Sequence, residues 1–253
     1  MNFVGKRLEG IGFLQEIARG VRSKIFLVSY QEKIFAAKFF MPEFYAFAER
    51  EYQFGHRLRH PNINQICQKV EVQDHAGVLM PFIPGKKLND YYSASPETFL
   101  PLFLGLLEGL KYLHEQDIIH RDIKPENVIV VNGVPKLIDF DLAKQASQLD
   151  SKKTLVGTIA YFSPEVVQGQ EASKTSDLYS AAVILYRALT GEVPFTGTLE
   201  EVMHAQEHTK PALPSSFHPE LKAYDELLRR ALAKNPLERF PSAAAFIGAL
   251  KAL

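Results

Sequence analysis

The chain has 253 residues and a formal net charge of zero, because 29 lysines and arginines balance 29 aspartates and glutamates. Hydrophobic residues make up 46% and charged residues 23%, which excludes a disordered, collagen-like or disulfide-rich chain. A neutral chain also lacks the basic excess of a dedicated nucleic-acid binder, and the single Cys67 cannot form an internal disulfide. The length allows one large domain or two packed lobes.

No segment of the sequence is predicted to span a membrane. The strongest apolar run, residues 99–107, is too short and contains Pro101 and Gly105. Residues 1–9 carry charge without a long apolar stretch behind them, so they do not resemble a secretory signal. We therefore expect a soluble cytoplasmic protein with no membrane segment in this chain.

Residues 13–83 are predicted to be rich in strands, with one helical interruption. Ser23–Tyr30 and Lys33–Phe40 are β-branched and aromatic, and they predict a hairpin. Residues 44–58 mix charged and aromatic side chains at helical spacing, and His60-Pro61-Asn62 ends that helix.

Two more strands are predicted at Gln65–Val72 and Gly77–Ile83, before Pro84-Gly85 breaks the chain. This break is the best lobe boundary. The expected organisation is a small lobe of about residues 1–83, a hinge of about 81–85 and a larger lobe of about 86–253.

After this boundary helices dominate the prediction. Val128–Val131 and Val134–Ile138 flank Asn132-Gly133, a strong signal for a tight turn between two strands. Ser176–Leu189 is apolar nearly all round, as a helix in the centre of a lobe is. Further helices are predicted at Pro96–Glu115, Thr198–Glu207, Leu221–Ala233 and Ser242–Leu253. The expected class is α+β, with a small antiparallel β-sheet lobe and a larger, mostly helical lobe.

Four short motifs follow one another in a fixed order. Residues 120–127 have the sequence HRDIKPEN, and Asp139-Phe140-Asp141 comes twelve residues after the asparagine. Upstream, residues 35–38 (FAAK) end a predicted strand; downstream, residues 163–165 (SPE) follow Gly157-Thr158. This ordered set resembles the signature of protein kinases, and the resemblance covers essentially the whole chain.

The resemblance implies a two-lobed protein-kinase-like fold that forms a single catalytic domain over residues 1–253. Lys124-Pro125-Glu126 and Gly157-Thr158 are similar to the serine/threonine branch. The implied activity is transfer of the ATP γ-phosphate to serine or threonine hydroxyls of a protein substrate, with Mg²⁺ as cofactor and Mn²⁺ as an alternative ion. Two other hypotheses stay open: a pseudokinase that acts as a nucleotide-binding or scaffolding module, and a kinase for small molecules. The oligomeric state stays unknown.

Phosphoryl transfer depends on positioning and charge neutralisation more than on covalent chemistry. By resemblance, Asp122 accepts or orients the proton of the substrate hydroxyl, and Lys124 steadies the γ-phosphate. Asn127 and Asp139 are implied to hold Mg²⁺, which prefers hard oxygen ligands.

The resemblance implies that Lys38 contacts the α- and β-phosphates of ATP and pairs with a glutamate on the following helix. Counting nine residues back from His60 gives Glu51, with Glu43 and Glu49 as alternatives. Only thirteen residues separate Lys38 from Glu51, so the helix is expected to be trimmed at its start.

The loop implied to cover the phosphates matches the family pattern least well. The three glycine positions fall on Ala18, Gly20 and Ser23, so only the middle glycine is kept. Glycines there let the backbone approach phosphates closely. Arg19 and Arg22 are expected to face the phosphates and to compensate electrostatically for the missing glycines.

An adenine site is implied on both sides of the hinge. The resemblance implies that Met80-Pro81-Phe82-Ile83 forms the hinge. The carbonyl of Pro81 would accept a hydrogen bond from the adenine amine, and the N–H of Ile83 would donate one to the ring. The apolar residues expected to sandwich the base are Ile25, Ala36, Leu88 and Ile129.

Two departures from the family pattern stand out. Asp141 replaces a glycine whose backbone freedom lets the Phe140 segment flip, so we expect Asp141 to resist the flipped-out state. Gly55 stands where the family has an apolar side chain stacked with Ile66, Phe140 and His120, which predicts either a gap in that column or a shifted helix register.

The segment between Asp139 and Glu165 is implied to be a regulatory activation segment. The Arg121-Asp122 pair resembles kinases that are switched on by phosphorylation there, since the arginine binds the phosphate. Thr154 is the favoured autophosphorylation site, with Ser147 and Ser151 as alternatives.

Four further residues are assigned structural roles by the same resemblance. Thr158 is expected to buttress Asp122 and Lys124. Glu165 and Arg239 are expected to form a buried ion pair, and Asp177 to tie the backbone of the 120–127 loop to the central helix.

Overall fold

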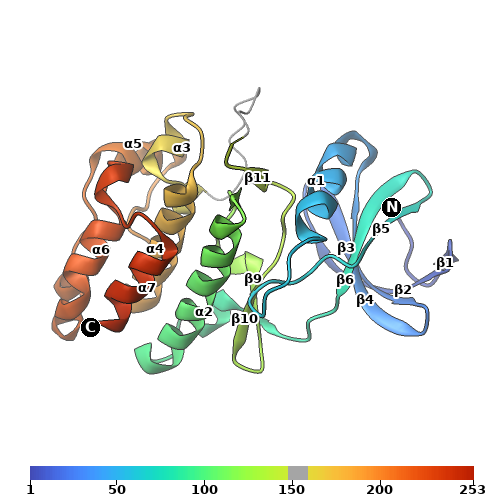
Figure 1. Ribbon diagram of the computed structural model, residues 1–253, viewed down its shortest axis with the longest axis horizontal. Helices are drawn as coiled ribbons and strands as arrows, with labels where there is room; N and C mark the ends of the chain where they lie inside the picture. Colours follow the sequence, from blue (N-terminus) through green and yellow to red (C-terminus); the bar gives the residue numbers. More distant parts are fainter. Residues whose placement is uncertain (148–158) are drawn as a thin grey trace. The chain divides into compact units, whose positions relative to one another are not determined.

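The computed structural model describes residues 1–147 and 159–253 of the chain. The described residues form two compact units (Figure 1): Met1–Gly85 with Ile138–Ala143 make up the first, and Lys86–Leu137 with the residues from Lys144 to Leu253 make up the second. The motif Asp139-Phe140-Asp141 therefore packs with the first unit although the chain on either side of it belongs to the second. Within the described ranges, no helix is long and apolar enough to cross a membrane.

The first unit is built on one antiparallel sheet with the strand order β1-β2-β3-β4-β6-β5. Its strands are β1 (Arg7–Leu8), β2 (Ile11–Arg19), β3 (Ser23–Tyr30), β4 (Lys33–Phe40), β5 (Gln68–Val72) and β6 (His75–Pro81). The predicted hairpin of β3 and β4 is confirmed with the predicted bounds. Gln31 and Glu32 both have positive φ (47° and 61°), so the two-residue turn has the twist that a tight hairpin requires.

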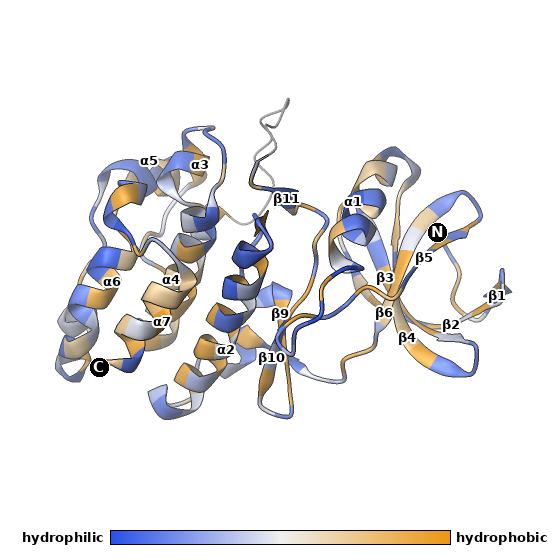
Figure 2. Ribbon diagram, in the orientation of Figure 1, coloured by the Kyte–Doolittle hydropathy of each residue, from blue (hydrophilic) through white to orange (hydrophobic). Residues whose placement is uncertain are grey.

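From Ala36 to Phe40, strand β4 is buried on both of its faces, and Figure 2 colours much of the strand as hydrophobic. Side chains alternate along a strand, so Ala37 and Phe39 point to one face and Ala36 and Lys38 to the other. Phe39 packs with Phe3, Phe13 and Phe26 in an aromatic cluster. The opposite face brings Ala36 into a second apolar cluster. Lys38 is thus presented on the face of the sheet that carries the expected adenine-contacting residues.

Helix α1 (Tyr45–Gly55) follows β4 after a 3₁₀ turn at Pro42–Phe44. It ends three residues before the predicted Leu58. A Cβ atom added to Gly55 would lie 2.3 Å from Cγ1 of Ile66, so the side chain of Ile66 occupies the space beside the glycine. Both alternatives raised by Gly55 are therefore wrong: the register that buries Glu51 and Gly55 is correct, and Ile66 fills the column at this point.

The second unit is mostly helical, which together with the sheet of the first unit confirms the expected α+β class. Its helices are α2 (Pro96–Glu115), α3 (Pro164–Val167), α4 (Lys174–Thr190), α5 (Leu199–His208), α6 (Asp225–Ala231) and α7 (Ala243–Lys251). Its short strands are β7 (Lys86–Lys87), β8 (Ile118–Ile119), β9 (Val128–Val131), β10 (Val134–Leu137) and β11 (Lys144–Gln145). The sequence did not predict α3, β7, β8 or β11, which are too short to carry a periodic signal.

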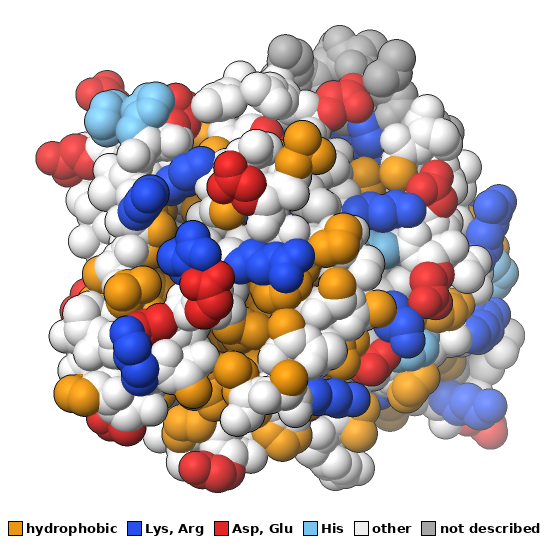
Figure 3. All heavy atoms as spheres, turned by 60° about the vertical axis from the view of Figure 1, so that its left-hand side comes forward, with side chains coloured by type: hydrophobic (Ala, Val, Ile, Leu, Met, Phe, Trp, Pro, Cys, Tyr) orange, Lys and Arg blue, Asp and Glu red, His pale blue; other side chains and the backbone are white. Residues whose placement is uncertain are grey.

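Helix α4 lies at the centre of the second unit, buried on nearly every side as predicted. Helix α2 packs against both α4 and α7. The α4 helix ends at Thr190 and is capped by Gly191, whose φ of 84° is a left-handed conformation that glycine adopts without strain. On the face of the molecule drawn in Figure 3, acidic and basic side chains are interspersed, in keeping with the zero net charge.

Candidate active site

Lys38 lies at the centre of a charged cluster in the first unit. Its Nζ atom is 2.8 Å from Oε2 of Glu51, 2.8 Å from Oδ1 of Asp139 and 3.2 Å from Oδ2 of Asp141. The Lys38 side chain is only 3% exposed. Strand β4, helix α1 and the segment 138–143 therefore each supply one part of a single buried site.

The geometry of α1 selects Glu51 as the partner of Lys38. Ala48, Glu51 and Gly55 share the buried face of the helix, at the three- and four-residue spacing of one helical stripe. Glu49 lies outside that stripe and pairs with Lys69. Glu43 precedes the helix in the exposed 3₁₀ turn. The glutamate beside Lys38 is thus the one predicted, not either alternative.

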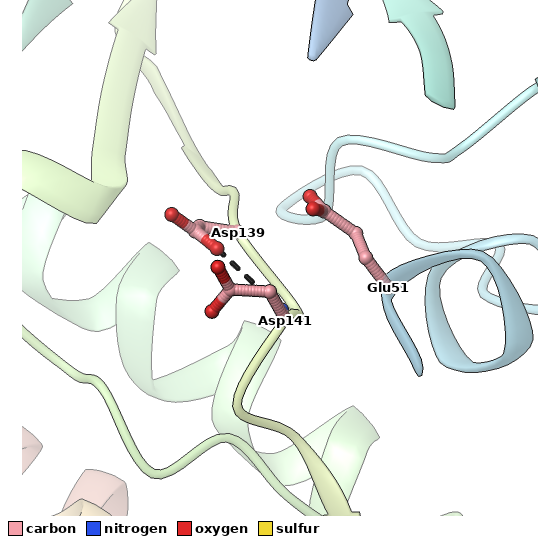
Figure 4. Close-up of side chains that lie close together, drawn as sticks. All are labelled: Glu51, Asp139 and Asp141. Carbon is pink, nitrogen blue, oxygen red and sulfur yellow. Dashed lines mark hydrogen bonds between the residues drawn. The ribbon is translucent and has the colours of Figure 1, made fainter. Parts of the chain in front are cut away.

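The cluster holds more negative than positive charge. Burial opposes the charge on Lys38, but Asp139, Glu51 and Asp141 outweigh it and raise the pKa of Lys38 above its ordinary value. Burial raises the pKa of Glu51 and of Asp141. One oxygen from each of the three carboxylates lies within 4.8 Å of the other two (Figure 4). An added cation would find hard oxygen donors here.

The two arginines at the turn between β2 and β3, Arg19 and Arg22, differ in what they contact. Arg22 Nη2 donates to both carboxylate oxygens of Asp141, at 3.2 Å each. Arg19 instead forms an exposed pair with Glu16 on its own strand. Arg22 is therefore part of the Lys38 cluster, whereas the observed contact of Arg19 is a local surface pair.

A tight turn joins the antiparallel strands β2 and β3. Ala18 pairs with Ile25, and the N–H of Gly20 donates to the carbonyl of Ser23 at 2.9 Å. A Cβ at Gly20 would meet nothing closer than 3.7 Å, and its φ is not positive. In this structure the turn does not require a glycine, which explains how a sequence with one glycine can form it.

Three of the residues expected at an adenine site lie together in the first unit. Ile25 packs on an apolar cluster that contains Ala36 and Met80. The carbonyl of Pro81 accepts a hydrogen bond from Nδ2 of Asn64 at 3.3 Å. Asn64 was not predicted, because no local sequence pattern marks a residue that reaches a strand end seventeen positions away. Ile83 follows β6, and its carbonyl accepts from the N–H of Gly85 at 2.9 Å.

The other two residues expected to contact adenine belong to the second unit. Leu88 is fully buried, and Ile129 on β9 is half-buried and pairs with Lys87 of β7.

The loop at residues 120–127 brings three predicted residues of the second unit together. Lys124 Nζ lies 2.7 Å from Oδ2 of Asp122. Nδ2 of Asn127 donates to the same oxygen at 2.9 Å and to the Asp122 carbonyl at 2.8 Å. With its Nδ2 turned to Asp122, Asn127 directs its amide oxygen away from this aspartate. The carboxylate of Asp122 is thereby fixed by two donors on one of its oxygens.

Asp177, at the start of α4, anchors this loop as predicted. Its two carboxylate oxygens each accept a backbone N–H, from His120 and from Arg121, at 2.9 Å. Nε2 of His114 lies 3.0 Å from the same carboxylate. Arg121 has a φ of 71°, an uncommon conformation for a non-glycine residue, and the bond to Asp177 supports it.

The predicted ion pair between Glu165 and Arg239 is also confirmed. Two hydrogen bonds of 2.8 and 2.7 Å join the guanidinium to the carboxylate, and Ser176 donates to the same carboxylate at 2.6 Å. Burial alone would raise the pKa of Glu165, but the hydrogen bonds and charge of Arg239 lower it.

The expected activation segment is described only at its ends. Ser147 is exposed. Ser151, Thr154, Gly157 and Thr158 lie outside the described residues. Phe140 is fully buried, and Asp141 does not adopt a positive φ; in this motif it is Asp139 that does, with a φ of 69°. Replacing the family's glycine by Asp141 therefore introduces no left-handed strain here, and resistance of Asp141 to a flip of Phe140 stays a prediction.

Comparison with known proteins gives a family for these motifs. The family model described as the protein kinase domain matches residues 12–247. The chain belongs to the protein kinase family. The fold class that the motifs implied is therefore confirmed, and membership of this family implies in general the use of ATP and a divalent metal.

Bacterial protein kinases are among the curated relatives. The serine/threonine-protein kinase PknB of Mycobacterium tuberculosis is 33% identical over 219 residues, which is 80% of this chain and 35% of the relative. PrkC of Bacillus subtilis is 31% identical over 211 residues, 79% of this chain and 32% of the relative. The chain thus spans about a third of the length of the curated relatives it matches.

Proposed function

We propose that this protein kinase chain is a single catalytic domain that transfers the γ-phosphate of ATP to serine or threonine hydroxyls of protein substrates. The serine/threonine class is supported by the serine/threonine-protein kinases among the relatives and by Lys124-Pro125-Glu126 in the loop. In this proposal Asp122 orients the substrate hydroxyl and takes its proton, and Lys124 steadies the γ-phosphate. Lys38, held by Glu51, binds the α- and β-phosphates.

The observation that carries the proposal is the buried ion pair of Lys38 with Glu51 and Asp139. A lysine held by two elements that are far apart in sequence presents its charge in one fixed direction, which is what binding a polyphosphate requires. Catalysis of phosphoryl transfer is almost entirely positioning and electrostatic stabilisation.

The residues proposed to hold the metal are Asp139 and Asn127. Their donors are a carboxylate and an amide oxygen, which suit Mg²⁺ and also Mn²⁺. The carboxylate of Asp139 is 27% exposed, and it lies in a cluster where three carboxylates surround one lysine. The donor set and the excess of negative charge fit a divalent cation. When bound, the ion would neutralise phosphate charge during transfer.

The decisive experiment is incubation of the purified chain with Mg²⁺ and ATP, followed by mass spectrometry of the intact protein and its peptides. We expect added phosphate groups on serine or threonine, and their loss in Asp139→Asn, since an amide cannot supply the charge that a metal-binding carboxylate does. Phosphate that appears equally in Asp139→Asn would refute the assigned role. A folded wild type that phosphorylates neither itself nor a generic protein substrate would refute the catalytic function.

We further propose that Thr154 is the favoured autophosphorylation site, with Ser147 and Ser151 as alternatives. The proposal rests on the Arg121-Asp122 pair in the loop, because such an arginine can bind a phosphate nearby. Thr154→Ala is expected to lower activity and to remove one phosphate from the peptide map. Unchanged activity together with no phosphate at Thr154 in the wild type would reject it, and Ser147→Ala serves as the matched comparison.

One observation favours the pseudokinase alternative. Asp141 places a third carboxylate near Lys38, at 3.2 Å, in a position where the family has an uncharged glycine. A domain that binds nucleotide without transfer would give nucleotide-dependent stabilisation in the same samples but no added phosphate. Measuring both quantities therefore separates the two functions.

A further inference from the structure

Asp141 is held from two sides by cations of the first unit. Arg22 Nη2 lies 3.2 Å from each of its carboxylate oxygens, and Lys38 Nζ lies 3.2 Å from Oδ2. The carboxylate is 4% exposed and the Arg22 side chain 18% exposed. This is a partly desolvated contact rather than a surface pair, so its attraction is less weakened by water and salt.

Arg22 is also fixed on its other side. Its guanidinium lies over the ring of Phe47, 4.7 Å from the ring centroid. Arg50 lies 5.6 Å from the centroid of the same ring, and its Nη1 is 3.5 Å from the backbone carbonyl of Asp141. Helix α1 therefore supports the arrangement, and the turn between β2 and β3 is tied to the Asp139-Phe140-Asp141 segment. The Arg22–Asp141 pair defines what we term the loop clasp.

We propose that Asp141 acts as an internal competitor of the nucleotide's phosphates, so that binding of nucleotide must open the loop clasp. This inference rests on the proposed function, in which Lys38 binds the phosphates of ATP. Both Lys38 and Arg22 contact Asp141, so a polyphosphate that enters must exchange with this carboxylate for the same two cations. Asp141 is thus a positioning residue that sets the affinity for nucleotide and holds the loop in place without it.

The exchange has a definite thermodynamic sign. Any interaction made only in the nucleotide-free state stabilises that state and lowers the affinity for the ligand that breaks it. Removing the charge of Asp141 frees Lys38 and Arg22 for the phosphates, so nucleotide should bind more tightly. Removing the charge of Arg22 deletes a cation from the phosphate site, so nucleotide should bind more weakly.

The test measures binding of ADP in the presence of EDTA by titration calorimetry, because a metal ion would add its own interactions with Asp139. Asp141→Asn keeps the size of the side chain and removes its charge. We expect this variant to bind ADP about five- to tenfold more tightly, in the range of a lost charge-assisted pair. Arg22→Gln should bind several-fold more weakly, and Asp141→Asn should gain less when it is made in the Arg22→Gln background.

Arg19→Gln is the matched control, since it removes the same charge from the same loop but from a residue paired with Glu16. Its effect on ADP affinity should be smaller than that of Arg22→Gln. Hydrogen exchange of residues 18–23 gives a second measurement: without nucleotide, Asp141→Asn should exchange faster there than the wild type.

The outcomes separate this inference from the proposed function. If the wild type binds ADP and Asp141→Asn binds it equally or more weakly, the competition is refuted while nucleotide binding stands. Equal effects of Arg19→Gln and Arg22→Gln would also refute it, because they would show a general charge effect. A wild type that binds no nucleotide with or without Mg²⁺ refutes both. Should Asp141→Asn fail to fold, Asp141→Gly, which installs the family's residue, replaces it with the same expected direction.

Discussion

Lys38 keeps its positive charge in a position where burial alone would remove it. A buried lysine ordinarily loses its proton more easily, because desolvation penalises the charged form. Here Asp139, Glu51 and Asp141 reverse the effect and raise the pKa of Lys38. The three carboxylates therefore favour the charged form of Lys38, and its charge depends on the groups that hold it.

At this scale we predict the effect of Glu51→Gln. The amide has the same shape but no charge, so Lys38 keeps only its ion pairs with Asp139 and Asp141. We expect its side chain to shift toward these two aspartates. We expect kcat/KM for a peptide substrate to fall roughly ten- to a hundredfold, as misplacement of a catalytic group does. Steady-state kinetics measure this directly.

Glu49→Gln is the control for that variant, because Glu49 lies on the same helix and pairs with Lys69 outside the cluster. It should leave kcat/KM nearly unchanged. Equal activity of Glu51→Gln and the wild type would show that the ion pair does not position Lys38.

At the scale of elements, helix α1 packs closely on Ile66 because Gly55 has no side chain. Ile66 lies against Gly55 so closely that even a methyl group there would overlap its Cγ1 atom. The backbone supports the contact, since the N–H of Ile66 donates to the carbonyl of Gly55 at 3.2 Å. Because Glu51 lies one turn before Gly55 on the buried face, this contact also sets how close Glu51 comes to Lys38.

We therefore predict that Gly55→Ala destabilises the protein, although alanine is the better helix former. Overpacking typically lowers the free energy of unfolding by about 1–3 kcal/mol, whereas the higher helix propensity of alanine raises it by about 1 kcal/mol. In an Ile66→Ala background the clash is removed, and the same change should become neutral or stabilising. Urea unfolding of the four proteins measures this coupling.

Gly248→Ala provides the contrast, because this glycine lies on an exposed face of α7 with nothing within 4 Å of an added Cβ. Alanine there should stabilise the protein. Additive effects of Gly55→Ala and Ile66→Ala would contradict the proposed packing.

At the scale of the whole molecule, a buried ion pair joins two distant segments of the second unit. Glu165 and Arg239 are 74 positions apart in sequence and form two hydrogen bonds. Arg239 also donates to the carbonyls of Ala233 and Lys234, so it holds together the chain around α6 and the start of α3. Removing one member of such a pair leaves the other charge buried, which costs about 3–5 kcal/mol.

The pH dependence of this ion pair can be predicted from the sign of its shift. The pKa of Glu165 is lowered below its ordinary value of 4.5, so its stabilisation is complete above that pH and is lost as the pH falls through the lowered pKa. The difference in unfolding free energy between the wild type and Glu165→Gln should therefore be large at neutral pH and should shrink in acid.

Chemical unfolding at a series of pH values measures that difference. Glu226→Gln, which breaks an exposed pair with Arg229, should change stability little at any pH. A difference for Glu165→Gln that stays constant from neutral pH to pH values well below 4.5 would contradict the assignment.

Elements with strong local signals were predictable from the sequence. β3, β4, α2 and β9 have the predicted bounds, because their periodicity and turn residues agree with their tertiary environment. Two-residue strands such as β8 and β11 were not, since they exist only through pairing with each other. Helix α1 was predicted to end at Leu58, three residues later than it does, and at its observed end Gly55 lies against the side chain of Ile66, a tertiary contact that the local pattern does not show.

The sequence by itself determined which residues are available for chemistry and in what order: a lysine at the end of a strand, a loop with Asp122, Lys124 and Asn127, and an acidic motif after it. Only the tertiary structure decided their partners. It selected Glu51 over two other glutamates, and it placed Arg22 rather than Arg19 on Asp141. The reason is physical: spacing along the chain fixes local geometry, whereas ion pairs form between segments that only the folded backbone brings together.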